Sequence, residues 1–187
     1  VFGLFIQSSF HNVVSENTIS QNKYHGITFL SCYDSSISRN VLKENNQLYF
    51  LLDAVFQPFG YNSSAGIYIV DSFRNTIMEN SIHSNNYNGI SLILSGRNSI
   101  SNNSLKSNNQ TGLLLFGSRF NRIFKNTFLD NTNDAFFNMC FCNRWKGNYW
   151  NEARILPKLI HGKLLFRPWI NIDWHPAQEP YTIPKTG

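Results

Sequence analysis

The sequence predicts an all-β fold, a three-sided parallel β-helix of about six coils with 23 residues in each coil. Three observations predict it: an internal repeat of 23 residues, short apolar segments within every repeat, and asparagines that return at fixed places. Within one repeat, Asn98, Asn103 and Asn108 lie five residues apart. Neither an amphipathic helix nor an alternating strand has this period, whereas a coil with tight corners does.

Each repeat opens with a glycine, at Gly3, Gly26, Gly66, Gly89 and Gly112. Three short apolar segments follow, and a polar residue, almost always asparagine, ends each of them. The three corner columns are Asn12, Ser35, Asn75, Asn98, Asn121; then Asn17, Asn40, Asn80, Asn103, Asn126; then Asn22, Asn45, Asn85, Asn108, Asn131. Asparagine tolerates the left-handed conformation of a sharp corner, and its amide can bond to the asparagines of neighbouring coils. We therefore expect asparagine ladders at the corners.

The sixth repeat is altered. We expect Ala135 to replace the glycine and one residue to be deleted, so that Asn143 and Asn148 continue the ladders and Trp145 and Trp150 enter the core. The β-helix is thus predicted to span residues 1–150. Residues 151–187 keep no repeat, hold five of the six prolines and are predicted to form a C-terminal capping segment. An alternative reading of the tryptophans in this part of the chain is a sugar-binding platform.

An insertion at residues 46–65 interrupts the second repeat. It is rich in aromatic residues, which are candidates for sugar stacking: Tyr49, Phe50, Phe56, Phe59 and Tyr61. The insertion could instead cover the outward side of the first strand of each coil, which carries apolar residues at Leu30, Val70, Ile93 and Phe116. The same apolar strand face could also support an oligomer.

Charge and hydropathy narrow the possible partners. The net charge is +5 and the pI is about 9.2, but the basic residues form no run and no nucleic-acid module, so we expect no nucleic-acid partner. No apolar run reaches the roughly 18 residues of a membrane-spanning helix. The chain starts without Met or a secretory signal, so we interpret it as a fragment of a longer protein.

Candidate catalytic residues lie in the outward columns. His11, Asp34 and Arg74 share one column, and Asp71 lies three residues before Arg74, so these four residues are the candidates for an acid/base cluster. A neighbouring column alternates in sign and predicts a solvated charge ladder. Glycoside cleavage normally needs two converging carboxylates, and the sequence has no dense acidic patch to supply them. The sequence therefore favours a noncatalytic protein.

Candidate metal ligands are few, so no cofactor is predicted, and calcium and copper stay open as alternatives. The segment Met139–Cys142 contains soft sulfur ligands of the kind that suit Cu(I). The repeat places Cys140 inward in a small-residue column with Cys32, which leaves Cys142 as the outward thiol. The sequence does not fix the redox state of these three cysteines.

The repeats GIYIVDSFRNTIMENSIHSNN and GISLILSGRNSISNNSLKSNN resemble the NosD-type β-helix repeats of the pectin-lyase-like superfamily. The ending GNYW with WINIDWHPAQEPY is similar to the C-terminal closure of archaeal secreted or surface β-helix proteins. The resemblance implies a right-handed solenoid, an extracytoplasmic location and either a polysaccharide partner or a role in copper-enzyme maturation. No catalytic motif of pectate lyases or polygalacturonases can be carried over.

The sequence thus predicts a noncatalytic secreted or cell-surface β-helix protein that binds carbohydrate, with a polysaccharide or cell-surface glycan as its partner. Two alternatives stay open. One is a polysaccharide lyase, glycosidase or epimerase, and the other is a NosD-like accessory protein of copper-enzyme maturation. Fold alone does not decide between them.

Overall fold

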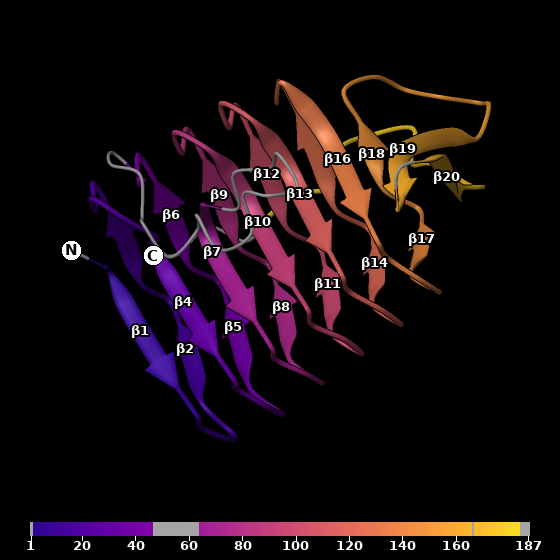
Figure 1. The fold of residues 1–187 in the computed structure, drawn as a ribbon. Coiled ribbons are helices and arrows are strands. Elements are labelled where there is room, and N and C mark those ends of the chain that lie inside the picture. The colour runs from indigo at the N-terminus through magenta and orange to yellow at the C-terminus, as the bar shows by residue number, and fades with distance from the viewer. Residues whose placement is uncertain (1, 47–63, 166, 184–187) are drawn as a thin grey trace.

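The computed structural model describes residues 2–46, 64–165 and 167–183, and it shows a three-sided solenoid of parallel strands (Figure 1). The first face contains β1 (Leu4–Gln7), β4 (Ile27–Leu30), β7 (Ala65–Val70), β10 (Asn88–Ile93), β13 (Thr111–Phe116) and β16 (Asn133–Asn138). The second face contains β2 (Val13–Ser15), β5 (Ser36–Ser38), β8 (Thr76–Met78), β11 (Ser99–Ser101), β14 (Arg122–Phe124) and β17 (Arg144–Lys146). The third face contains β3 (Thr18–Ser20), β6 (Val41–Lys43), β9 (Ser81–His83), β12 (Ser104–Lys106), β15 (Thr127–Leu129) and β18 (Tyr149–Trp150). The predicted fold class is confirmed.

The strand register follows the sequence repeat. Ile90 pairs with Ile67 on one side and with Leu113 on the other, each 23 residues away. Across the insertion the offset grows to 40, since Ile27 pairs with Ile67, yet the column continues unbroken. The described part of the chain holds no long apolar helix of the kind that spans a bilayer.

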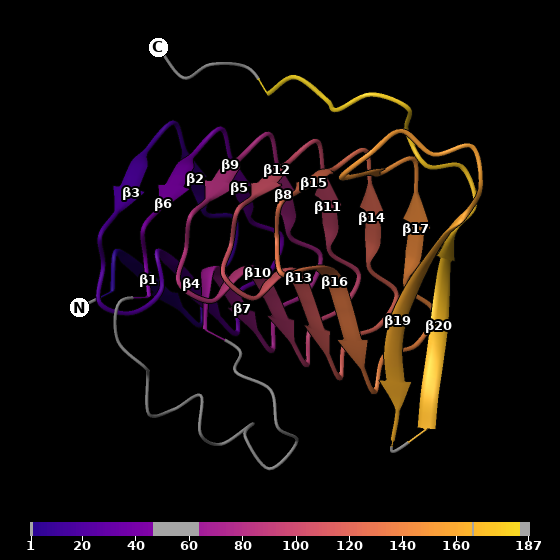
Figure 2. The same ribbon diagram turned by 90° about the horizontal axis from the view of Figure 1, so that it is seen from above.

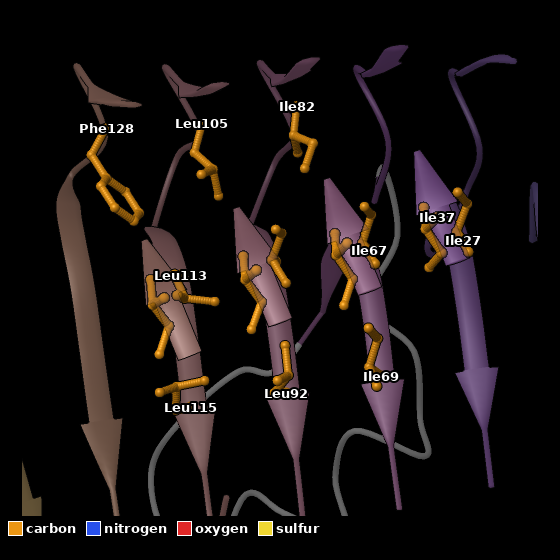
Figure 3. Packing of buried hydrophobic residues seen from close by; sticks show 14 of the residues in the cluster. Ile27, Ile37, Ile67, Ile69, Ile82, Leu92, Leu105, Leu113, Leu115 and Phe128 are labelled. Atoms are coloured by element: carbon orange, nitrogen blue, oxygen red, sulfur yellow. The ribbon is translucent and has the colours of Figure 1, made fainter. Parts of the chain in front are cut away.

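Inward-facing side chains of the three faces form one continuous core along the solenoid. Ile27, Ile67 and Leu113 are fully buried on the first face, and Leu105 and Phe128 meet them from the third (Figure 3). Trp145 and Trp150 are buried in the last coil, as predicted, and the Trp150 ring stacks on Phe128 with centroids 4.5 Å apart. Each coil therefore buries its apolar residues against the next, as stacked repeats do.

The predicted asparagine ladders are present, but the conformational reason for them is different. The left-handed residue of each corner is the one before the asparagine: φ is 57° at Arg97 and 52° at Asn102, before Asn98 and Asn103. The backbone N–H and Nδ2 of Asn98 both donate to Oδ1 of Asn121, at 2.9 and 3.1 Å. The asparagine thus points inward to bond along the ladder, while the residue that makes the bend points outward.

Glycine opens each coil because neighbouring coils approach closely there. A Cβ on Gly89 would lie 2.7 Å from the carbonyl oxygen of Gly112 and 3.0 Å from Asn108 Nδ2. The sixth coil departs from the prediction, since the register pairs Ala135 with Leu113 and so places Asp134 opposite Gly112. The one-residue deletion of the sixth coil therefore lies before β16 and not within it. A side chain fits at Asp134 because the pairing of β16 with the next strand starts only at Phe137.

A hairpin of β19 (Lys158–Leu164) and β20 (Arg167–Asp173) lies across the C-terminal end of the solenoid (Figure 2). β19 extends the first face by pairing with β16, and β20 extends the second face by pairing with β17. The hairpin therefore joins these two faces into one sheet of fourteen strands. Beyond it, Tyr181 returns along the corner between the second and third faces, where its hydroxyl donates to the Gly147 carbonyl at 2.7 Å.

Candidate functional site

The structure brings together two of the four predicted catalytic residues. Asp34 and Arg74 lie in register at the first corner, and the guanidinium binds the carboxylate through two hydrogen bonds of 2.7 and 2.8 Å. These bonds lower the pKa of Asp34 below its ordinary value. A general acid needs the opposite shift, so the arrangement favours a permanent ion pair over proton transfer.

His11 and Asp71 do not complete an acid/base cluster. His11 is exposed and lies in the same column as Asp34, and Coulomb attraction from it adds a small part to the lowered pKa of that carboxyl. Asp71 occupies another corner, where its carboxylate accepts a hydrogen bond of 3.2 Å from the Ser31 hydroxyl. The predicted group thus supplies one carboxylate held by arginine, and no second carboxylate from the described part of the chain converges on it.

A row of aromatic rings lies beside this corner. Phe10 and Tyr33 stack with ring centroids 5.2 Å apart, and Tyr33 and Phe73 stack at 5.9 Å. The Arg74 guanidinium lies 5.9 Å from the Tyr33 centroid. Since the rings stack on one another along the coils, their faces are used within the protein. This row therefore stabilises the solenoid and offers mainly ring edges to a ligand.

The sulfur residues do not fit a copper ion. The Cys140 side chain lies in the buried small-residue column, where the Ser118 N–H donates to its sulfur at 3.3 Å, and burial raises its pKa to about 12. Cys142, in the same segment between β16 and β17, is exposed, so of these two thiols Cys140 is buried and Cys142 reaches the surface, as predicted. Among the described residues, no three His, Cys, Asp or Glu side chains come close enough to share copper, calcium or another ion.

The predicted aromatic ligand residues, Tyr49, Phe50, Phe56, Phe59 and Tyr61, lie outside the described residues, as does most of the insertion at 46–65. The outward side of the first face is nevertheless buried within the single chain. Ile93 and Phe116 are 1% and 6% exposed and form a second apolar cluster with Ala65 and Tyr68. Ile93 and Phe116 thus offer little surface to a second copy, whereas Phe5 on β1 of the same face is 45% exposed, and the oligomer expectation stays a prediction.

The four tryptophans divide between the core and the surface. Trp145 and Trp150 are buried, whereas Trp169 and Trp174 are 52% and 63% exposed. Trp169 pairs across the hairpin with Gly162 and helps to line a hollow with Phe136, His161 and Pro168. An aromatic side chain opposite a strand glycine commonly shields the bare backbone. The tryptophan platform of the sequence prediction is thus reduced to two separate exposed rings.

One surface was missed by reading the sequence along the chain. Six exposed cations gather on the second face of the last three coils and on its corners, a surface that we call the basic face: Arg97, Arg119, Arg122, Lys125, Arg144 and Lys146. In the sequence they are separated by two to twenty-two residues, so no basic run appears. The repeat columns could have revealed them, because Arg122 and Arg144 occupy one column of the solenoid.

These features define the chain as a member of the class of parallel β-helix proteins. A family model described as periplasmic copper-binding protein (NosD) matches residues 2–155, so the chain belongs to this family. This confirms the resemblance seen in the repeats. A comparison with curated proteins gives no match.

Solved structures with the same fold include carbohydrate epimerases. The periplasmic alginate epimerase AlgG superimposes with a TM-score of 0.71 at 19% identity, covering 87% of this chain and 35% of that one. The A-module of the Azotobacter vinelandii mannuronan C-5 epimerase AlgE6 gives 0.55 at 14% identity, covering 81% and 47%. The AlgE4 A-module of the same organism gives 0.52 at 12%, covering 94% and 56%. The chain thus spans between about a third and just over half of these enzymes, and the likeness shows the fold.

Proposed function

We propose that this chain is a noncatalytic, extracytoplasmic β-helix that binds carbohydrate. The observation that carries the proposal is the repetition of its outward side chains. On the second face, Ser36, Thr76 and Ser99 stand in one column at the strand spacing of about 4.8 Å. This spacing is close to the length of one pyranose unit in an extended polysaccharide. A polymer of repeating sugars can therefore meet the same kind of side chain on successive coils.

The relatives support the choice of ligand and location. The structural neighbours are named as epimerases of alginate or mannuronan, which are polysaccharides, and the family and AlgG are both named as periplasmic. The chemistry of the first corner supports binding without turnover. Among the described residues its one carboxylate, Asp34, is held ionised by Arg74, whereas hydrolysis of a glycosidic bond canonically needs a pair of carboxyl groups in different protonation states.

The test is a panel of neutral and acidic polysaccharides in affinity electrophoresis, combined with lyase, hydrolase and epimerase assays with and without calcium. We expect retardation by at least one polysaccharide and no product. Turnover that is abolished in Asp34→Ala would show that the protein is an enzyme. Absence of binding to every polysaccharide in the panel would contradict the carbohydrate assignment itself.

A further inference from the structure

Charge is unevenly distributed over the outward surface of the second face and its two flanking corners. In the first three coils, the charges there are matched: Asp34 pairs with Arg74, and Arg39 lies 3.0 Å from Glu79 and 3.4 Å from Glu16. The last three coils carry the six cations of the basic face. Among the described residues, none of these six takes part in an ion pair or a side-chain hydrogen bond. An excess of positive charge is thus concentrated toward the C-terminal end of this surface.

The register makes this concentration unfavourable for the protein alone. Arg122 and Arg144 are direct neighbours on β14 and β17, and Phe124 neighbours Lys146. Like charges on directly paired residues destabilise a sheet. Earlier coils avoid the problem, since the column of Arg122 contains Ser36, Thr76 and Ser99. The fold therefore accepts serine or threonine there, and the two arginines call for a functional explanation.

Exposed aromatic rings accompany the cations. Phe120 and Phe141 are 51% and 55% exposed and lie at the corner that leads into β14 and β17. The Arg122 guanidinium lies 5.9 Å from the Phe124 ring centroid, which helps to hold its donors in place. Rings provide an apolar surface for a sugar face, and guanidinium groups bind carboxylates through paired hydrogen bonds.

We propose that the basic face binds an acidic polysaccharide of the uronate type, with the glycan chain running along the solenoid axis over the last three coils. This inference rests on the proposed function and adds the ligand's charge and its place on the surface. The carboxylates would meet Arg122 and Arg144 on neighbouring coils, at a spacing that approximates one sugar unit, and Arg97 at the corner of the coil before. A single-stranded nucleic acid could also use cations and rings, but its phosphates are spaced more widely than neighbouring strands.

The experiment compares Arg122→Ser/Arg144→Ser with Lys43→Ser/Lys106→Ser. Both double variants lose two positive charges, but the control removes them from the third face, where Ser20 shows that serine fits the same column. Titration calorimetry would use polygalacturonate and alginate as acidic polymers, fully methyl-esterified pectin and dextran as neutral ones, and an oligothymidylate. Circular dichroism and thermal melts would verify that both variants are folded.

We expect the protein to bind an acidic polymer more tightly than either neutral one, with an affinity that falls as sodium chloride is added. The basic-face variant should lose about tenfold in affinity, as the removal of two exposed charge contacts predicts. The loss of binding free energy in the control variant should be less than half as large. Equal binding of neutral and acidic polymers, or an equal loss in both variants, would overturn this inference and leave the proposed function standing. Absence of all polysaccharide binding would overturn both, and so would tight binding of the oligothymidylate alone.

Discussion

A buried polar side chain needs a partner for each of its hydrogen-bonding groups, and the asparagine columns meet this need by repetition. Asn103 illustrates it: Nδ2 donates to the carbonyl oxygens of Ile77 and Ser101 and to Oδ1 of Asn126. In turn, its Oδ1 accepts from the N–H and Nδ2 of Asn80. A buried polar network is most stable when all its members are satisfied, which explains why asparagine recurs in coil after coil and why its one replacement in these columns, Ser35, also accepts from the coil before.

The contribution of the buried His25 side chain to folding stability depends on pH. Its Nδ1 accepts a hydrogen bond of 3.2 Å from the Ala65 N–H, and its ring stacks on Tyr68 with centroids 4.2 Å apart. Burial lowers its pKa from 6.5 to about 3. The folded state therefore holds the neutral ring, while the unfolded chain takes up a proton below pH 6.5.

We predict that the free energy of unfolding falls as the pH is lowered from 6.5 toward 3, because the unfolded state binds one more proton in this window. The loss from His25 is at most about 1.4 kcal/mol per pH unit. Urea unfolding at several pH values measures it. His25→Gln should flatten this dependence, whereas His161→Gln, at an exposed site, should retain it; identical slopes in the wild type and His25→Gln would contradict the assignment.

At the scale of elements, the C-terminal hairpin is the part that sequence reasoning described least. The prolines and the loss of the repeat predicted a capping segment, but nothing in them indicated two seven-residue antiparallel strands. The 23-residue comparison could not reveal β19 and β20 because they do not follow the coil pattern. The residue of the hairpin that continues a column of the repeat is Asp173, at the end of β20.

Asp173 occupies the place that the next asparagine of the second ladder would hold. Its carboxylate accepts from the Asn148 N–H and Nδ2 at 2.8 and 3.0 Å, from the Gly147 N–H at 2.9 Å and from Trp150 Nε1 at 3.2 Å. An ionised carboxylate accepts hydrogen bonds and donates none, so it can end the ladder. An amide in the same place would bring N–H donors of its own, which would need a further acceptor. On this basis we propose that β19 and β20 cap the solenoid, as predicted for the segment 151–187.

We predict that Asp173→Asn destabilises the protein by about 1–3 kcal/mol, because an amide would place a donor against the donors of Asn148 or Gly147. Chemical denaturation measures the change, and limited proteolysis between residues 151 and 172 reports whether the hairpin detaches first. Asp130→Asn is the matched control, since Asp130 is exposed at another corner. Equal stability of the two variants would show that Asp173 does not end the ladder in solution.

At the scale of the whole molecule, the fold was predictable because the residue pattern that specifies one coil is repeated in the next. The columns of glycine, aliphatic residues and asparagine define strands, corners and register together, so even the 17 residues added between Asn45 and Gly66 did not disturb them. The basic face was not predicted because a solenoid brings together residues about one coil apart. Arg122 and Arg144 are distant in the sequence and adjacent in space. The candidate aromatic ligands of the insertion stay a prediction.

The same charge distribution gives a prediction for the molecule as a whole. At physiological ionic strength the screening length is about 8 Å, which exceeds the roughly 4.8 Å between neighbouring strands. The cations of the basic face therefore repel one another appreciably at low salt and less at high salt. Added sodium chloride should raise the free energy of unfolding through this surface, while it weakens the binding of an acidic polymer to the same surface.

Thermal melts across a salt series measure the stabilisation, with Arg122→Ser/Arg144→Ser beside the wild type and Lys43→Ser/Lys106→Ser as the control of equal charge. At low salt the basic-face variant should be more stable than the wild type by some tenths of a kcal/mol, and this advantage should shrink as salt is added. The control should show a smaller advantage, because His83 separates its two lysines in their column. If both variants responded to salt alike, the repulsion would reflect net charge and not the register of Arg122 and Arg144. A variant that is more stable yet binds less would mean that this surface sacrifices stability for binding, as functional sites commonly do.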